Sequence, residues 1–296
     1  MTAVPRLTVG LPVYNGENYL EKSIEALLSQ SYSDFELVIS DNASTDGTAD
    51  ICQRFEKEDS RIRYIRQPRN IGASPNHNFL IHEARGELFK AASHDDLYHP
   101  DLLKYCVAAL DEDPDAVLAH SWSAVINSAG DIEEKVDYPV STFSPRAPER
   151  FRSMLFDGWG DDDGGVTRLE VLRRTSLHGS YHFADRTFTV ELALHGPFRI
   201  VPEHLYYRRR HPGQGGKRSS VRARCSYLDP GRASRLRNPV ARLYAEYIWG
   251  YVSAIRHAPL SAQDRRECYG LLARWMAGRA FPVVTRTVTR SGLRTA

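Results

Sequence analysis

The sequence lacks the features that mark several broad classes of protein. Its 296 residues include only four cysteines, and no two of these have the C-x-x-C spacing of a zinc or redox motif. No apolar run approaches the roughly 20 residues that span a bilayer, and the first residues do not follow the pattern of a secretory signal peptide. We therefore expect reduced cysteines and a chain that stays in the cytoplasm, where it is made.

The glycine-rich dinucleotide motif, the P-loop and nucleic-acid-binding modules are missing as well. No G-x-G-x-x-G follows the first apolar run at 7–13, which argues against a dehydrogenase. The glycine-rich segment 213–218 is not a P-loop, because Arg218 stands where that motif needs Ser or Thr. No known DNA- or RNA-binding module is present, so we expect no nucleic-acid partner.

Charge is distributed unevenly along a chain whose composition is otherwise that of a folded globular protein. Residues 1–204 hold 20 lysines and arginines against 33 aspartates and glutamates, a net charge of −13. Residues 205–296 hold 19 against 4, a net charge of +15. We therefore expect the acidic part and the basic tail to have different roles.

Short apolar runs alternate with helical patterns through the first 126 residues. Strands are expected at 7–13, 35–40, 62–66, 88–92 and 116–126. Helices are expected at 17–30, after a cap at Ser44 or Thr45, from Pro75 to Ala84, and after Pro100. This alternation predicts a mainly parallel sheet with helices on both faces.

The pattern loosens beyond Asn127. We expect loops over 128–165 around one short helix near 149–156, then a helix near 185–195 and a strand near 198–207. Residues 212–239 are rich in Gly, Arg and Ser and are expected to be mobile, and helices are expected from Pro239 onward.

Four polar clusters follow the predicted strands, at 12–18, 41–48, 68–78 and 93–96. Open parallel sheets bind ligands beyond the carboxyl ends of their strands, so four clusters in succession predict a binding site along one edge. In the last cluster, Asp95 and Asp96 place two like charges side by side. A divalent cation such as Mg²⁺ or Mn²⁺ would compensate them; capping of the helix after Pro100 is the equally compatible alternative.

In this order and spacing, the clusters resemble the family 2 glycosyltransferases, which have the GT-A fold. The similarity lies in the P-x-Y-N-like turn at Pro12, in Asp41 before an S-x-D-G-T helix start, in the N-x-G…N pattern from Asn70 to Asn78, and in the acidic motif at 93–96. It covers roughly residues 6–210. It implies an α/β fold of GT-A type, a mainly parallel sheet flanked by helices, with a helical C-terminal extension.

The resemblance also implies domain boundaries. Residues 1–210 would form the glycosyltransferase domain, with a nucleotide-sugar-binding half at 1–127 and an acceptor half at 128–210. Residues 211–296 would form a basic, mostly helical C-terminal region.

For the donor site, the resemblance implies a nucleotide pocket lined by Pro12, Tyr14 and Glu17. Asp41 is similar to the family's acid that accepts a hydrogen bond from a pyrimidine N–H, which favours UDP- or dTDP-linked sugars. Asn70 to Asn78 would close over the nucleotide, although Asn70 and Gly72 would also suit a tight turn.

The acidic motif departs from the family's D-x-D-D pattern, because Ser93 replaces the first Asp. That position usually helps to hold the donor, and His94 is the candidate to supply a contact instead. Asp95 matches the family's metal-binding Asp. The resemblance therefore implies a divalent cation held by Asp95, Asp96 and His211, with His211 as a direct or outer ligand.

The resemblance places the catalytic base in an E-D pair that opens a helix, matched here by Ala184 and Asp185. Asp185 would take the proton of the acceptor hydroxyl. Its alternative role is the N-cap of that helix. Glu191, inside the helix, is the weaker candidate.

The sequence leaves the roles of three charged stretches open. The run 160–165 contains three aspartates, which would bind acceptor hydroxyls or a second cation, or form a solvated turn. Lys217 and Arg218 would lie on a flap that meets the donor diphosphate. The basic tail would either contact an anionic membrane surface at the inner face or serve packing and oligomerisation.

The resulting hypothesis is a metal-dependent, inverting glycosyltransferase. It would move a sugar from a nucleoside-diphosphate sugar to the hydroxyl of a glycan or lipid-linked acceptor, in cell-surface polysaccharide or glycolipid biosynthesis. Two alternatives stay open: a non-catalytic relative that binds nucleotide sugars, and a nucleotidyltransferase that makes them.

Overall fold

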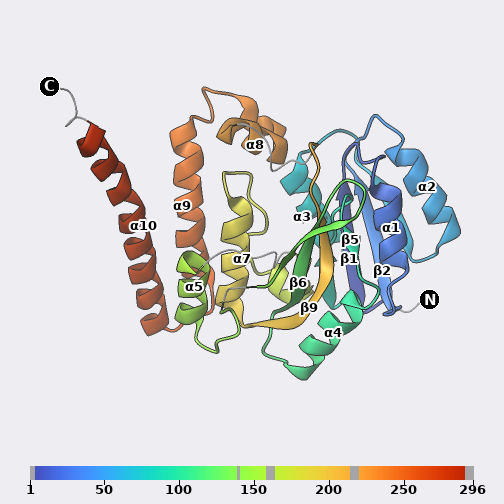
Figure 1. Ribbon diagram of the computed structural model, residues 1–296, viewed down its shortest axis with the longest axis horizontal. Helices are drawn as coiled ribbons and strands as arrows, with labels where there is room; N and C mark the ends of the chain where they lie inside the picture. The colour runs from blue at the N-terminus through green and yellow to red at the C-terminus, as the bar shows by residue number, and fades with distance from the viewer. Residues whose placement is uncertain (1–3, 139–140, 158–163, 214–219, 291–296) are drawn as a thin grey trace.

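The computed structural model describes residues 4–138, 141–157, 164–213 and 220–290 (Figure 1). Within these residues, nine strands form one sheet in the order β3-β2-β1-β4-β8-β6-β9-β5, and β7 pairs with β6. The strands are β1 (Leu7–Val13), β2 (Phe35–Asp41), β3 (Ile62–Arg66), β4 (Leu88–Ala91), β5 (Leu97–Tyr98), β6 (Leu118–Ile126), β7 (Ile132–Val136), β8 (Val166–Arg168) and β9 (Phe198–Arg209).

Six strands of the described sheet run in one direction. β1 pairs in parallel with β2 and β4, β2 with β3, and β6 with β9. β8 lies antiparallel between β4 and β6, so these two strands also share a direction. The carboxyl ends of β1, β2, β4 and β9 therefore meet at the same edge of the sheet.

Helices cover both faces of the sheet, as Figure 1 shows. Side chains alternate along a strand, so Leu37 and Ile39 of β2 pack into one core cluster and Val38 into the other. The first cluster includes α1 (Leu20–Leu28), α2 (Thr48–Glu58) and α4 (Leu102–Glu112), and the second includes α3 (Ala73–Glu83), α5 (Ala147–Phe156), α6 (Leu169–Leu172) and α7 (Ala184–His195). The predicted α/β sheet flanked by helices is confirmed.

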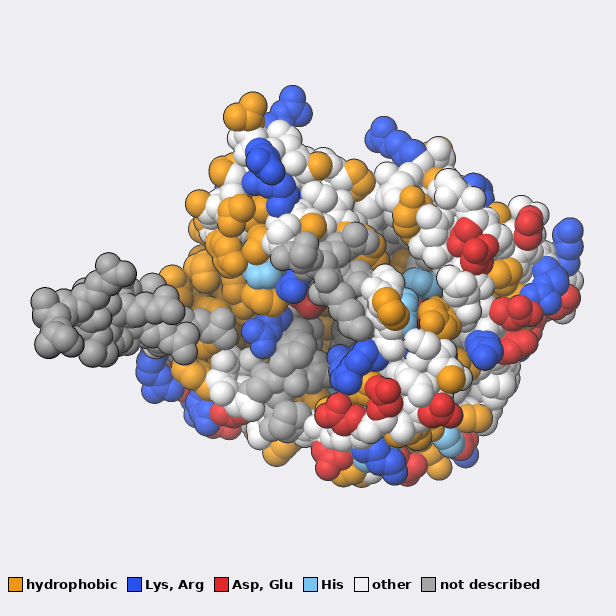
Figure 2. Space-filling view, turned by 45° about the horizontal axis from the view of Figure 1, so that its top comes forward, with side chains coloured by type: hydrophobic (Ala, Val, Ile, Leu, Met, Phe, Trp, Pro, Cys, Tyr) orange, Lys and Arg blue, Asp and Glu red, His pale blue; other side chains and the backbone are white. Residues whose placement is uncertain are grey.

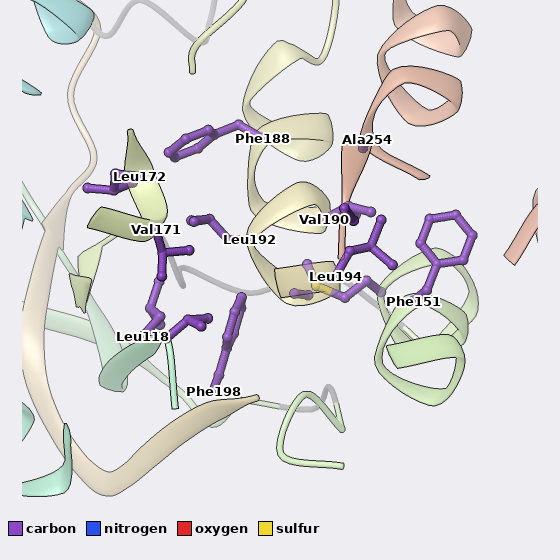
Figure 3. Close-up of a cluster of buried hydrophobic side chains, with 14 of the residues drawn as sticks. Leu118, Phe151, Val171, Leu172, Phe188, Val190, Leu192, Leu194, Phe198 and Ala254 are labelled. Atoms are coloured by element: carbon purple, nitrogen blue, oxygen red, sulfur yellow. The ribbon is translucent and has the colours of Figure 1, made fainter. Parts of the chain in front are cut away.

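Helix α7 is buried on two sides. Figure 3 shows Phe188 and Leu192 on the side of Leu172 and Leu118, whereas Val190 and Leu194 lie on the side of Phe151 of α5. The predicted C-terminal helices are α9 (Val240–His257), which packs against α7, and α10 (Ala262–Arg290), which packs against α5 and α9. None of the helices in the described part of the chain has both the length and the apolar character of a membrane span.

Several local predictions were wrong. Neither Ser44 nor Thr45 caps α2; the helix begins at Thr48, whose amide donates to the Asp46 side chain over 3.1 Å. Helix α3 begins at Ala73, before Pro75. Helix α4 begins at Leu102, after Pro100 as predicted, but the short strand β5 that precedes it was not predicted.

The predicted loop regions also contain regular elements. Strand β7 extends β6 into a hairpin within the stretch expected to be loops, and β8 and α6 follow residue 165. In the stretch 212–239, the described residues form α8 (Val221–Leu228) and the 3₁₀ helix η3 (Pro230–Ala233). Ser220 caps α8 by accepting from the Ala223 amide, a signal that the sequence contained.

Candidate functional site

The loops after β1 and β2 hold each other in place at the carboxyl edge of the sheet. The Asn15 amide donates to Ser44 Oγ over 2.9 Å, and the Gly16 amide donates to Thr48 Oγ1 over the same distance. Glu17 Oε2 accepts from the Gly47 amide over 2.7 Å. The structure therefore uses Glu17 to join the two loops.

The Asp41 carboxylate lies at the end of β2 and is completely buried. Its Oδ1 accepts from the Ser44 amide over 2.8 Å, and its Oδ2 accepts from the Tyr64 hydroxyl over 2.9 Å and from the Arg66 guanidinium over 3.0 Å. Since a carboxylate offers about four lone-pair positions, these three donors leave one position for a further donor.

A cavity of about 130 Å³ lies above this edge. We call it the tyrosine cavity, because Tyr14 and Tyr227 line it and are exposed to a similar extent. Its lining also includes Pro12, Val13, Asn42, Asn70, Ala73, Asn76, His94, Ser226 and Pro230. The structure thus brings together Pro12, Tyr14, Asn70 and His94, which the sequence predicted, whereas Glu17, Asp41 and Asn78 do not line this cavity.

Two of these lining residues are tightly held. Asn70 Oδ1 accepts from the Gly72 amide over 2.9 Å and from Asn42 Nδ2 over 3.1 Å, so the tight-turn role of Asn70 is present. The His94 ring packs so closely on Gly16 that a Cβ there would lie 2.6 Å from His94 Cδ2. Burial lowers the pKa of His94 and favours the neutral ring.

The far wall of the tyrosine cavity comes from α8 and η3, which sequence reasoning missed. These elements dock on Gly72, the N-cap residue of α3: a Cβ on Gly72 would lie 2.4 Å from the Leu228 carbonyl oxygen. Gly72 has a φ of +97°, which L-residues rarely adopt. The glycine in the N-x-G pattern was the available signal, but its docking partner lies more than 150 residues away.

The acidic motif splits into two different environments. Asp95 Oδ2 lies 2.9 Å from His211 Nε2. Asp96 is buried, and its carboxylate accepts from the Tyr206 hydroxyl and, over 2.8 Å, from the Arg209 amide. Burial, and then the charge of Asp95, raise the pKa of Asp96 to about 7. The structure therefore pairs Asp95 with His211 and engages Asp96 with β9.

Arg209 is a further residue of this motif that sequence reasoning did not single out. Its side chain is buried, its Nε donates to the Asp95 carbonyl over 2.7 Å, and its guanidinium lies 4.7 Å from the centre of the Tyr19 ring. Arg209 thereby ties the acidic motif to β9, the strand that leads to His211.

The residues present fit a divalent cation with few protein ligands. Asp95 supplies a carboxylate oxygen and His211 an imidazole nitrogen at one point of the site. Among the described residues, no group of three or more His, Cys, Asp or Glu could hold a metal ion. A cation here would therefore complete its shell with ligand phosphates and water, as Mg²⁺ commonly does.

A second cavity, of about 140 Å³, adjoins the first at Pro12, which lines both. We call it the histidine cavity, because His77 of α3 and His178 line it. Its other lining residues are Phe89, Ala91, Ala92, Ser93, Leu118, Gly164, Thr167, Leu172, Phe188, Leu192 and Tyr206. Figure 2 shows a hollow in the molecular surface, with histidine side chains on its margin.

Asn78 holds one wall of the histidine cavity in place. Its Nδ2 donates to the His178 carbonyl, and its Oδ1 accepts from the His178 amide, both over 3.0 Å. Ser74 Oγ donates to the Gly179 carbonyl over 2.8 Å. The segment that leads into α7 is therefore fastened to α3.

Asp185 lies in the first turn of α7 and is exposed. The helix ends shortly before β9, and β9 runs to the acidic motif, so the N-terminus of α7 lies at the carboxyl end of the sheet (Figure 1). The N-cap alternative for Asp185 was wrong, because Phe183 is the N-cap. In the described part of the chain, no hydrogen bond or ion pair engages the Asp185 carboxylate.

Glu191 serves a different purpose within α7. It is buried, and its carboxylate accepts from the Ser176 amide over 3.0 Å and from the Ser176 hydroxyl over 3.1 Å. Burial raises its pKa. Three other predicted features lie outside the described residues: the aspartates of the run 160–165, Lys217 and Arg218.

The chain is similar in sequence and in fold to known proteins. The family described as "Glycosyl transferase family 2" matches residues 8–164, more than half of the chain. The "Putative teichuronic acid biosynthesis glycosyltransferase TuaG" of Bacillus subtilis (strain 168) is 36% identical over 100 residues, which are 34% of this chain and 40% of that protein. The chain thus spans about two-fifths of the length of this relative.

A longer match is the "GalNAc(5)-diNAcBac-PP-undecaprenol beta-1,3-glucosyltransferase" of Campylobacter jejuni, 24% identical over 239 residues, which are 76% of this chain and 73% of that protein. Among solved structures, S. aureus TarS 1–349 in complex with UDP-GlcNAc superposes with a TM-score of 0.67 and 19% identity, covering 92% of this chain and 71% of that chain. At this identity, the structural likeness concerns the fold alone.

Proposed function

The chain belongs to glycosyl transferase family 2 and has the GT-A fold predicted from its sequence, and on this premise we propose that it transfers a sugar from a nucleoside-diphosphate sugar to an acceptor hydroxyl. One observation carries the proposal. The tyrosine cavity, the Asp95–His211 pair and the exposed carboxylate of Asp185 lie at the same end of one sheet. Such an edge is where open α/β sheets bind ligands.

The tyrosine cavity is the proposed nucleotide site. Tyr14 and Tyr227 supply aromatic faces on which a base can stack. Asp41, buried at the end of β2 beside this edge, is similar to the family's acid that accepts a hydrogen bond from a pyrimidine N–H. UDP- and dTDP-sugars are therefore the proposed donors.

Asp95 and His211 are the proposed holders of Mg²⁺ or Mn²⁺. When bound, the cation would neutralise the negative charge that develops on the departing diphosphate. Arg209 holds the Asp95 backbone in position, and His211 keeps the Asp95 carboxylate oriented.

Asp185 is the proposed general base. Its exposed carboxylate takes the proton of the acceptor hydroxyl while that oxygen attacks the anomeric carbon from the face opposite the diphosphate. The new carbon–oxygen bond forms as the bond to the phosphate oxygen breaks, so the configuration inverts in a single displacement. Holding donor and acceptor in the reactive geometry would lower the barrier by several kcal/mol, on the order of the translational and rotational entropy that the two reactants lose on binding.

The proposed setting is cell-surface polysaccharide or glycolipid biosynthesis, with a glycan or lipid-linked acceptor. The names of the Bacillus and Campylobacter relatives, which mention teichuronic acid and an undecaprenol-linked glycan, support this setting. The excess of positive charge in residues 205–296 supports peripheral contact of the C-terminal region with the inner face of the membrane. We keep the proposed division into a glycosyltransferase domain at 1–210 and a basic region at 211–296.

A thermal-shift screen of nucleoside diphosphates and their sugars, with and without Mn²⁺, tests the proposal. A native donor should raise the melting temperature, and part of that rise should depend on Mn²⁺. Asp95→Asn should remove the Mn²⁺-dependent part, whereas Asp157→Asn, in an exposed ion pair with Arg152, should not.

Donor hydrolysis in Mn²⁺ then separates an enzyme from a non-catalytic binding protein. A melting temperature that no nucleotide sugar raises would contradict the proposed function.

A further inference from the structure

The histidine cavity is lined by neutral side chains. None of its described lining residues is a lysine, arginine, aspartate or glutamate. The nearby ammonium group of Lys90 donates to the Gly164 carbonyl and lies 5.5 Å from the centre of the Tyr206 ring, so it belongs to the layer behind the wall. Most of the lining is aliphatic or aromatic, as in pockets that bind compact organic ligands.

Two polar atoms in this apolar lining have no partner. His77 Nδ1 and His178 Nε2 are buried, and neither finds a hydrogen-bonding partner among the described residues. Native proteins satisfy nearly all buried polar atoms, and a ligand in the cavity that reached these two nitrogens would supply the missing partners. The ring centres of the two histidines lie only 4.1 Å apart.

Both rings are neutral near pH 7. Burial lowers the pKa of His77 to about 4, and burial together with the neighbouring His77 lowers the pKa of His178 well below its usual value. A neutral imidazole offers one N–H donor and one acceptor nitrogen. Sugar hydroxyl groups, which both donate and accept, complement such a pair.

The cavity lies where the sugar of a donor would have to be. It adjoins the tyrosine cavity at Pro12, and Ser93 of the acidic motif lines it. Phe188, one turn beyond Asp185 on α7, forms another part of the wall, as Figure 3 shows for its position beside Leu172. The cavity therefore connects the proposed nucleotide site with the helix that carries the proposed base.

We propose that the histidine cavity binds the sugar of the donor, and that His77 and His178 restrict this sugar to an uncharged one. This inference rests on the proposed function. The two rings pair with hydroxyl groups of the sugar, while Phe89 and Phe188 pack against its C–H groups. A uronic acid would bring a carboxylate into a cavity whose described lining holds no lysine or arginine, and this carboxylate would lose its hydration there.

The first test compares two donors that differ only at C6 of the sugar, which carries a hydroxymethyl group in one and a carboxylate in the other. Titration calorimetry of the full chain in Mn²⁺ measures the affinity for free UDP and free dTDP, and then for the glucose and glucuronate derivatives of the nucleotide that binds. We expect the glucose derivative to bind at least about 10-fold more tightly than the glucuronate derivative.

The second test removes the hydrogen-bonding atoms. His77→Leu and His178→Leu should each weaken binding of the glucose derivative about 10-fold, with free nucleotide binding unchanged. The matched control is His195→Leu, because His195 lies on α7, has a buried unpartnered Nε2 and lies outside the cavity. It should change neither affinity. Thermal unfolding of each variant checks that it is folded, and His178→Asn, which keeps polar atoms, should recover part of the affinity.

The outcomes separate the two levels of the proposal. If neither nucleotide binds, the proposed donor class fails and this inference fails with it. If a nucleotide binds but the two sugars bind equally, or if the leucine variants affect free nucleotide and nucleotide sugar alike, the inference about the histidine cavity is overturned and the proposed function stands.

Discussion

The two adjoining cavities differ in how their walls are assembled. Eight of the eleven described lining residues of the tyrosine cavity belong to polar clusters that follow strands in sequence, which is why the sequence showed a motif there. Only three of the fourteen described lining residues of the histidine cavity, Pro12, His77 and Ser93, belong to such clusters. The rest of its wall comes largely from helix faces and from strands with antiparallel or distant partners. Turn residues leave a local pattern, whereas a wall assembled from helix faces leaves none.

The cavities also differ in how their polar atoms are used. Around the tyrosine cavity, Asn70 and the neighbouring loops are held by side-chain to backbone hydrogen bonds. In the histidine cavity, ring nitrogens are buried without partners. The first site is preorganised by its own contacts, and the second has unsatisfied atoms that a ligand can satisfy.

The largest expected effect is the loss of the proposed general base on α7, the helix that also lines the histidine cavity. Asp185→Asn should lower turnover by about 10²-fold or more, because the general base is lost. The affinity for donor should stay nearly the same, since Asp185 lines neither cavity. Steady-state kinetics and calorimetry measure the two quantities. Glu170→Gln, an exposed carboxylate on α6, is the control, and unchanged turnover in Asp185→Asn would remove this residue from the base role.

A backbone change should damage the tyrosine cavity alone. Gly72→Ala places a Cβ against the Leu228 carbonyl at a φ of +97°. Strain of this kind costs about 1–3 kcal/mol, and it should appear as reduced stability in urea denaturation together with weaker nucleotide binding. Gly270→Ala is the control, because a Cβ there meets nothing within 4 Å. Unaltered nucleotide affinity in Gly72→Ala would show that α8 and η3 are not needed for the nucleotide.

Tyr14 and Tyr227 should contribute equally to nucleotide binding, although only Tyr14 was predicted from the sequence. Tyr14→Ala and Tyr227→Ala should each weaken binding of the free nucleotide about 10-fold, in line with the usual cost of losing one base-stacking ring. The preference for an uncharged sugar should persist in both. Tyr269→Ala, a similarly exposed tyrosine on α10, should have no effect. If only Tyr14→Ala weakened binding strongly, Tyr227 and therefore α8 would not contribute to the nucleotide site.

The smallest effect concerns pH and the histidine cavity. The pKa of His77 is about 4 in the folded chain, against about 6.5 in an unfolded one, so the folded chain binds fewer protons between these values. Stability from neutral His77 is therefore complete above about pH 6.5 and is lost as the pH falls toward about 4, by at most about 1.4 kcal/mol per pH unit.

Urea denaturation across this range measures the loss. His77→Leu should flatten the pH dependence, whereas His82→Leu, an exposed histidine on the same helix, should leave it as it is. An equal slope in wild type and His77→Leu would contradict the burial argument.

Most of the fold could be predicted because its signals are local. The strand at 7–13 and that at 62–66 have the predicted bounds, and α7 begins within one residue of its predicted start. The errors lie where tertiary contacts compete with local signals. Strand β8 has three residues and forms only because β4 and β6 flank it, and α8 docks on Gly72.

The candidate site shows the same division. The resemblance to family 2 glycosyltransferases predicted that Asp95 and His211 lie close together, and the structure places Asp95 Oδ2 and His211 Nε2 2.9 Å apart. The roles of Asn78 and Arg209 did not follow, because each depends on a partner about 100 residues away in the chain.

By itself, the sequence determined that strands alternate with helices, that polar turns gather at one edge of a parallel sheet, and that the family motifs are present. These features depend on side-chain periodicity and turn chemistry within a few residues. The tertiary structure alone decided that Asp96 faces β9 while Asp95 faces His211. It also decided that α8 lines the tyrosine cavity and that two neutral histidines lie together in the lining of the histidine cavity. The reason is that burial and pairing between distant segments depend on packing, and no local stretch of chain encodes which distant atoms will become its neighbours.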